Sequence, residues 1–162
     1  MAAPSAAGSP EILTGLIAEV TGRIQNRPLD QHLENDLNHW FPADGCECQS
    51  ILRLCEGAIA AGWMCNREAN GIRFGRLIKP GPQTHGFSVD VVEMPPVAGP
   101  HHRHPSGEID LIMPMDPEAL FDGRGRGWLV YGPDSAHHPT VTGGRALVLY
   151  LLPAGAIEFT RR

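Results

Sequence analysis

In the first 65 or so residues, apolar side chains recur at intervals of three and four, which is the spacing of one face of a helix. Three stretches show this pattern: residues 10–24, 28–40 and 48–61. Pro10 and Pro28 suit the first turn of a helix, and Gly62 suits the position after the last turn. The pattern therefore predicts a helical N-terminal segment over residues 1–65, with its apolar stripes facing a core.

From Gly71 onwards the chain consists of short apolar runs separated by glycine and proline, which is typical of strands joined by turns. The candidate strands are residues 72–79, 87–94, 108–113, 128–131, 138–141, 146–152 and 156–159. Several short strands at this spacing indicate a sandwich or a barrel. We therefore predict a mostly β protein in which residues 71–162 form a β-barrel behind the helical segment.

Composition limits the classes of function. The 162 residues are 42% hydrophobic and carry a net charge of −5, which argues against disorder and against nucleic acid as a partner. No apolar run approaches the length of a membrane span, and the first residues lack the features of a secretory signal. The four cysteines contain no CxxC pair. We expect a cytoplasmic protein with reduced thiols and no membrane partner.

Histidines are concentrated in one part of the chain, since five of the eight lie between His101 and His138. His102 and His104 are two residues apart, so on a strand they point to the same face. Glu108 follows a Pro-Ser-Gly turn and can return to that face. Two imidazoles and a carboxylate suit a divalent transition metal ion, which we expect to be Fe, Zn, Mn or Ni.

The doubled histidine at 137 and 138 can supply a fourth ligand from a distant strand. Strand parity and the five-residue spacing from Pro133 favour His138, and His137 remains the alternative because the doubling leaves an ambiguity of one residue. The predicted metal ligands are His102, His104, Glu108 and His138.

These residues resemble the two motifs of the cupins, G-x5-HxH-x3,4-E-x6-G and G-x5-PxG-x2-H-x3-N. The matching positions are His102, His104, Glu108, Gly127, Pro133 and His138. The chain has Pro96, Met115 and Ser135 where the motifs have glycine, and Thr142 where they end in asparagine. These differences concern turns rather than ligands. The resemblance implies a cupin jelly-roll barrel.

Strand parity places Asp110 on the same face as Glu108, inside the barrel. There it can hold an imidazole N–H, or it can move protons with a raised pKa.

His85 lies in a turn that can overhang the mouth of the barrel. Arg73 and Arg76 lie on opposite faces of one strand, so at most one readily enters a pocket that binds a carboxylate. The candidate catalytic residues are Glu108, Asp110 and His85.

Nearly the whole chain is similar to the small bacterial 4-hydroxylaminobenzoate lyases. The similar segments are residues 62–65, 86–92, 99–105, 107–110 and 127–133. The resemblance implies conversion of 4-hydroxylaminobenzoate, a small aromatic carboxylate, to 3,4-dihydroxybenzoate (protocatechuate) and ammonia in nitroaromatic degradation.

Two other classes of function use the same ligands. One is a metal-dependent cupin dioxygenase acting on an aromatic or organic acid, and the other is a ligand-sensing cupin without activity. A lyase works without oxygen and releases ammonia, a dioxygenase consumes oxygen, and a sensor binds without turnover. We also expect a homo-oligomer, because a jelly roll of this size commonly pairs its exposed sheet.

Overall fold

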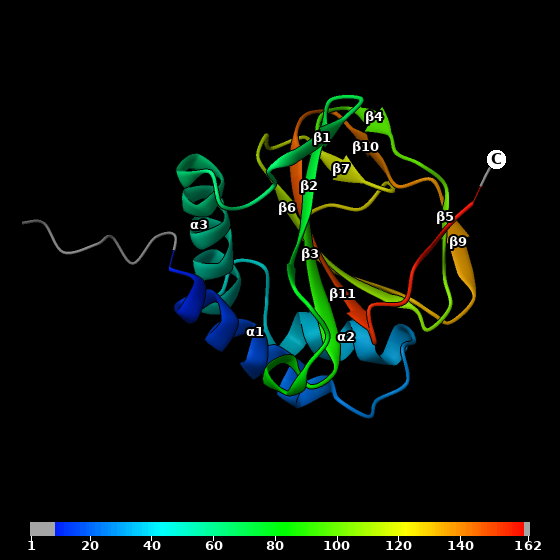
Figure 1. Ribbon diagram of the computed structural model, residues 1–162. Coiled ribbons are helices and arrows are strands. Elements are labelled where there is room, and N and C mark those ends of the chain that lie inside the picture. Colours follow the sequence, from blue (N-terminus) through cyan, green and yellow to red (C-terminus); the bar gives the residue numbers. More distant parts are fainter. Residues whose placement is uncertain (1–8, 161–162) are drawn as a thin grey trace, which may run out of the picture.

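The computed structural model describes residues 9–160, which form three α-helices followed by an antiparallel β-barrel (Figure 1). The helices are α1 (Pro10–Ile24), α2 (Gln31–Trp40) and α3 (Cys46–Ala61), and a short 3-10 helix, η1, spans Pro82–Thr84. The strands are β1 (Arg67–Ala69), β2 (Ile72–Ile78), β3 (Phe87–Met94), β4 (Val97–Ala98), β5 (His102–His104), β6 (Glu108–Pro114), β7 (Leu120–Phe121), β8 (Gly127–Tyr131), β9 (Ser135–His137), β10 (Thr140–Thr142), β11 (Ala146–Pro153) and β12 (Glu158–Phe159).

Local chemistry accounts for where the helices begin and end. The Ser9 hydroxyl accepts a hydrogen bond from the Ile12 N–H, and Pro10 occupies the first turn of α1. The second helix begins at Gln31 rather than at Pro28 as predicted, because the carboxylate of Asp30 accepts the Leu33 N–H at 2.9 Å and caps the helix there. Helix α3 ends at Ala61 and is followed by the capping residue Gly62, whose φ of 86° suits a residue without a side chain.

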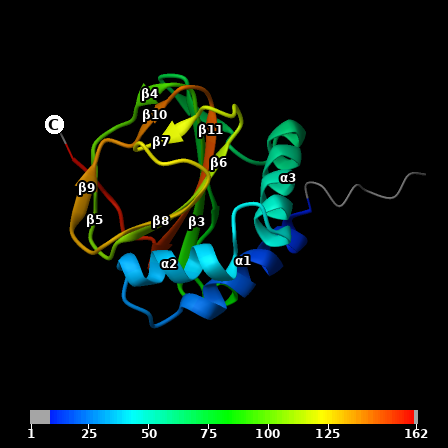
Figure 2. The ribbon, with the colours of Figure 1, turned by 180° about the vertical axis from the view of Figure 1, so that it is seen from behind.

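Six strands form the main sheet, in the order β1-β2-β3-β11-β6-β8, and all neighbouring strands are antiparallel. Two three-stranded sheets, β4-β10-β7 and β12-β5-β9, complete the barrel. The helices gather along the outer side of the main sheet, whereas β5 and β9 lie across the barrel from them (Figures 1 and 2).

The main sheet has two different faces because side chains alternate along each strand. Ile109 and Leu111 of β6 belong to a hydrophobic cluster shared with the helices, whereas Ile112 belongs to a second cluster inside the barrel. The predicted division of β6 into an inner and an outer face is therefore confirmed. The cross-strand register also places a polar row on the inner face: Arg76, Asp90, Tyr150 and Asp110.

The prediction of a mostly β fold behind a helical segment is confirmed. The change from helices to strands falls between Ala61 and Arg67. Strands β1, β4, β7 and β9 are not among the predicted strands, because strands of two or three residues are too short to show alternation. The helices and the sheet share one core, and the division into two domains stays a prediction. No helix within residues 9–160 is long and apolar enough to cross a membrane.

Candidate metal centre

Strand β5 brings His102 and His104 to the inside of the barrel. The strand lies between β12 and β9, and its middle residue, Arg103, points outward to Glu158 and Asp134. The two imidazoles are 3% and 0% exposed, and their ring centroids are 4.7 Å apart. Both rings are therefore shielded from water on one face of one strand, as the HxH spacing predicts.

Glu108 is the first residue of β6 and reaches the same place after a tight turn. Its carboxylate oxygens lie 3.3 Å from His104 Nε2 and 3.6 Å from His102 Nε2, and the residue is 0% exposed. The turn depends on Gly107, which has a φ of 89°. A Cβ atom there would lie 2.7 Å from the Tyr131 carbonyl oxygen, so a side chain does not fit. The glycine thus permits the close approach that returns Glu108 to the histidines.

The structure brings His137, and not His138, to this cluster. His137 pairs directly with His102 across β9 and β5, so the two side chains share a face, and their Nε2 atoms are 3.1 Å apart. His138 follows the end of β9, where its Nδ1 lies 3.1 Å from the Gly99 carbonyl oxygen and its ring packs on His101. The choice of His138 over His137 is therefore corrected.

The four side chains of His102, His104, Glu108 and His137 offer ligand atoms that all lie within 4.8 Å of one another. Ligands about 2.1 Å from one ion are separated by about 3 to 4 Å, so four of the distances among these atoms, which are 3.1 to 3.7 Å, suit a shared ion. Both Glu108 oxygens and His104 Nε2 are buried, and within residues 9–160 none of the three makes a hydrogen bond of good geometry, since their polar neighbours are the other members of the cluster and Asp110. Buried polar atoms rarely stay unpaired. These residues therefore fit a divalent transition metal ion.

The charge distribution agrees with this fit. Burial alone would raise the pKa of Glu108, but the neighbouring imidazoles of His102 and His104 outweigh burial and lower its pKa below the usual range. An ionised Glu108 adds one negative charge to three imidazoles, which is the mixture of ligands that borderline divalent ions accept.

Two polar side chains hold the outer nitrogens of these rings. The Nδ1 atom of His104 lies 2.9 Å from the Ser135 hydroxyl, and Nδ1 of His137 lies 2.6 Å from an oxygen of Asp122. The same Asp122 oxygen accepts a hydrogen bond from the hydroxyl of Tyr131. Asp122 and Tyr131 are not among the predicted site residues, because no motif links them to the histidines and only the folding of separate strands brings them together.

Asp110 lies inside the barrel, as parity predicts, and is 0% exposed. Its ionisable neighbour is the carboxylate of Glu108, two residues earlier on the same face of β6. Burial, followed by the negative charge of Glu108, raises the pKa of Asp110 well above its usual value. The carboxyl group is thus suited to carry a proton near the cluster.

His85 does not lie at the cluster. It follows η1, and its Nδ1 is 2.9 Å from the Thr21 hydroxyl on α1, where the ring also touches Gly22. The turn that carries it folds against the helical layer rather than over the mouth of the barrel. The expectation that His85 overhangs the mouth of the barrel is therefore wrong, and its part in catalysis stays a prediction that this position does not favour.

A cavity of about 1410 Å³ opens beside the cluster and includes His102 in its wall. Its apolar side chains include Phe74, Val92 and Tyr150 from the inner face of the main sheet. Of the two arginines on β2, Arg76 lines this cavity and donates to both oxygens of Asp90, whereas Arg73 pairs with Glu93. The barrel therefore offers an apolar space with polar groups in its wall.

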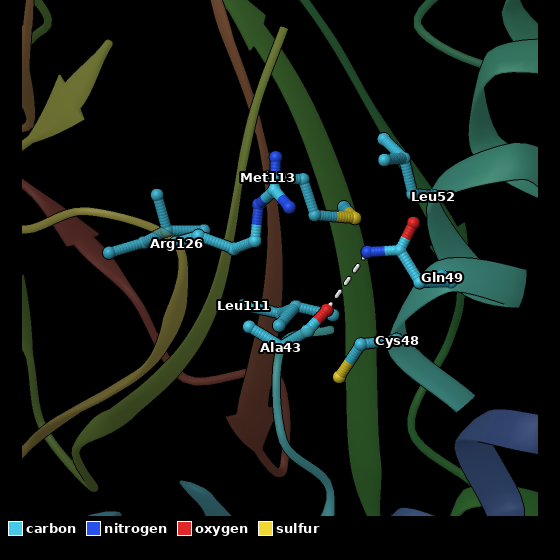
Figure 3. Close-up of a pocket in the computed structure, with 8 residues that line it drawn as sticks. Ala43, Cys48, Gln49, Leu52, Leu111, Met113 and Arg126 are labelled. Atoms are coloured by element: carbon cyan, nitrogen blue, oxygen red, sulfur yellow. Dashed lines mark hydrogen bonds between the residues drawn. The ribbon is translucent and has the colours of Figure 1, made fainter. Parts of the chain in front are cut away.

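A second cavity lies outside the barrel, between α3 and the outer face of β6 (Figure 3). Its volume is about 10 Å³, room for a single water molecule at most. Gln49 on one side donates a hydrogen bond of 3.0 Å to the Ala43 carbonyl oxygen (Figure 3). Cys48, Leu111 and Met113 also line this cavity. This space is a small gap in helix packing and is too small for an aromatic substrate.

An antiparallel barrel that holds three imidazoles and a carboxylate on its inner face is a cupin. The family model described as "PnbB: 4-hydroxylaminobenzoate lyase" matches residues 15–159. The chain belongs to this family.

Two relatives carry the name 4-hydroxylaminobenzoate lyase. The one from Pseudomonas putida is 30% identical over 164 residues, with 91% of this chain and 93% of the relative covered. The one from Nocardioides sp. (strain LMS-CY) is 30% identical over 160 residues, with 93% and 95% covered.

Solved structures that are similar to this chain include an RmlC-like cupin protein from Ralstonia eutropha JMP134. It is 13% identical, with a TM-score of 0.43, and the match covers 57% of this chain and 62% of that one. Another is described as a structure of the DMSP lyases RdDddP and RnDddQII. It is 18% identical, with a TM-score of 0.45, and the match covers 94% of this chain and all of the other.

Proposed function

We propose that this protein converts 4-hydroxylaminobenzoate to 3,4-dihydroxybenzoate and ammonia, with a divalent transition metal ion held by His102, His104, Glu108 and His137. One observation carries the proposal: in a chain of this lyase family, a buried cluster of three imidazoles and a carboxylate borders a cavity with apolar walls. The activity itself is the one named for both relatives.

The cavity suits an aromatic carboxylate. Phe74, Val92 and Tyr150 offer apolar surface to a benzene ring, and His102 borders the same space. Both Arg67 and Arg76 line the cavity, but Asp90 already neutralises Arg76. We therefore assign Arg67 as the cation that binds the carboxylate of the substrate.

The overall reaction adds one water molecule and releases one ammonia molecule, without an external oxidant. Breaking the N–O bond reduces the nitrogen, and the ring carbon that gains a hydroxyl group is oxidised in exchange. The leaving hydroxyl departs as water once it has received a proton. Water then adds to the ring, and hydrolysis of the remaining C=N bond releases ammonia.

Asp110 is the proton donor in this scheme. Its carboxyl group is fully buried beside Glu108, and burial and the negative charge of Glu108 raise its pKa, so it keeps a proton to give to the leaving oxygen. Once ionised, it can take a proton back from the water that adds to the ring. Glu108 remains ionised throughout as a ligand. When bound, the ion supplies Lewis-acid stabilisation of the charge that develops on the hydroxyl oxygen.

Anaerobic turnover tests this proposal. The purified full chain is analysed for metals and then incubated with 4-hydroxylaminobenzoate without oxygen, while ammonia and 3,4-dihydroxybenzoate are measured. We expect equal amounts of both products, and their near absence in the Glu108→Gln variant, which keeps the volume and removes the charge. A strict requirement for oxygen would move the protein to the dioxygenases, and binding without products would make it a sensor.

The expected setting of this activity is the cytoplasm, in a homo-oligomer. A catabolic substrate supports the cytoplasmic location. Both the location and the homo-oligomer stay predictions.

A further inference from the structure

The carboxylate of Asp122 takes part in three hydrogen bonds that join four parts of the barrel. It directly follows β7, with a φ of 50°. One carboxylate oxygen accepts the Thr140 N–H at 2.9 Å, and the other accepts from Tyr131 and faces His137 Nδ1 at 2.6 Å. The bonds from Thr140 and Tyr131 hold the carboxylate in place without help from His137.

A carboxylate only accepts hydrogen bonds, so Nδ1 of His137 must carry the proton that joins it to Asp122. A neutral imidazole has one N–H, and Nε2 of His137 is therefore left with a free electron pair. That atom points at His102 Nε2, at 3.1 Å, and at Glu108, at 3.7 Å. Asp122 thus determines which nitrogen of His137 is available to a cation.

Ser135 acts on His104 in the same way. Its hydroxyl donates to the Gly132 carbonyl oxygen at 2.7 Å, which uses its only proton. The hydroxyl oxygen can then only accept from His104 Nδ1, at 2.9 Å, so a neutral His104 ring carries its proton on Nδ1 and offers Nε2 to a cation. Ser135 stands where the cupin motif has a glycine, which could not make this bond. Two rings on different strands are thus held in the same tautomer.

We propose that Asp122 is the positioning residue that prepares His137 for metal binding, and that Ser135 does the same for His104. The inference rests on the proposed metal site and adds the residues that set its affinity.

Two substitutions at Asp122 separate positioning from a merely structural contribution. In Asp122→Asn the amide oxygen keeps the bond from Thr140 N–H, so the NH₂ group faces His137 Nδ1. The donor forces the proton of His137 onto Nε2, the tautomer that cannot bind a cation. In Asp122→Ala the ring is free to adopt either tautomer. If Asp122 contributes only to structure, Asp122→Ala should bind the metal more weakly than Asp122→Asn. If Asp122 positions His137, Asp122→Asn should bind the metal more weakly than Asp122→Ala.

The test uses the full chain with its metal removed. Long-range proton–nitrogen NMR spectra report which nitrogen of each imidazole is protonated, and competition with a chromophoric chelator reports the Kd for Zn²⁺. We expect His137 protonated at Nδ1 in the unmodified chain and at Nε2 in Asp122→Asn. We also expect a Kd raised about 10–100-fold in Asp122→Asn and less in Asp122→Ala.

Asp134→Asn is the matched control, because it removes the same charge from an exposed carboxylate that pairs with Arg103 instead. Its Kd should stay within about twofold of the unmodified chain. The inference is overturned if His137 keeps its tautomer in Asp122→Asn, or if Asp122→Ala binds Zn²⁺ more weakly than Asp122→Asn. If the unmodified chain binds no Zn²⁺, the proposed metal site fails, while the NMR measurement still decides whether Asp122 sets the tautomer.

Discussion

His102 and His137 face each other across two antiparallel strands, with their Nε2 atoms 3.1 Å apart. Two such atoms carry free electron pairs when both rings are protonated at Nδ1, and a cation between them then relieves their repulsion. This pair, rather than the HxH spacing alone, defines the centre of the site.

We first predict that His137→Ala and His138→Ala differ in metal content. Removing His137 deletes one of four ligands, so Zn²⁺ affinity should fall by at least about tenfold. His138 faces Gly99 instead, so its removal should leave the affinity within about twofold. Metal analysis after dialysis against a weak chelator gives both values. Equal loss in the two variants would show that both histidines contribute to the site.

A second prediction separates proton transfer from metal binding at Asp110. Asp110→Asn preserves the volume of a fully buried side chain but has no acidic proton. We expect turnover to fall by about a hundredfold or more, because general acid catalysis contributes on that scale, while Zn²⁺ affinity stays nearly constant.

The measurements are ammonia release at saturating substrate and a chelator competition on the same sample. If the affinity falls about tenfold while turnover per bound metal is unchanged, Asp110 supports a ligand instead of moving a proton.

A third prediction concerns the turn before Glu108. Gly107→Ala places a Cβ atom 2.6 Å from Leu29 Cδ2 and 2.7 Å from the Tyr131 carbonyl oxygen. Gly123→Ala is the matched control, since its φ of 77° is similar but nothing lies within 4 Å of the added atom. The control should lose about 1–2 kcal/mol from backbone strain alone, and Gly107→Ala should lose more.

Urea unfolding measures both free energies of unfolding. Similar losses in the two variants would mean that Leu29 and Tyr131 move aside at little cost.

The fourth prediction is a pH dependence of stability at Glu34, which joins α2 to β8. One of its oxygens accepts the Val130 N–H at 2.9 Å, and the other accepts from Gln31 and Arg124. Burial raises the pKa of Glu34, but these hydrogen bonds outweigh burial and lower it below the usual 4.5. Because the pKa of Glu34 is lower in the folded than in the unfolded chain, its ionised carboxylate stabilises the fold at any pH above the unfolded pKa. This stabilisation is lost as the pH falls below about 4.5.

Glu34→Gln should therefore lose about 1–3 kcal/mol at pH 7, because charge-assisted bonds to a buried carboxylate are lost. The difference from the unmodified chain should shrink as the pH falls from 5 towards 3. Glu19→Gln, on the exposed side of α1, serves as the control and should show no such trend. A difference that stays constant with pH would assign the effect to packing.

The sequence by itself determined the features that depend on near neighbours in the chain. Spacing of three and four predicts the helices, and alternation predicts that Glu108, Asp110 and Ile112 face the interior while Ile109 and Leu111 face outward. Both follow from the fixed geometry of a helix and a strand, in which side-chain direction repeats with a constant period. The HxHxxxE spacing indicates three of the four cluster residues for the same reason.

Only the tertiary structure decided which distant residues join His102, His104 and Glu108 in the cluster. The choice between His137 and His138 depends on the register of β9 against β5, and a shift of one residue turns every side chain to the other face. Asp122 and Tyr131 reach His137 through the folding of separate strands, and His85 is carried away because its turn packs on α1. These placements depend on how strands and helices pack together, which spacing along the chain does not contain.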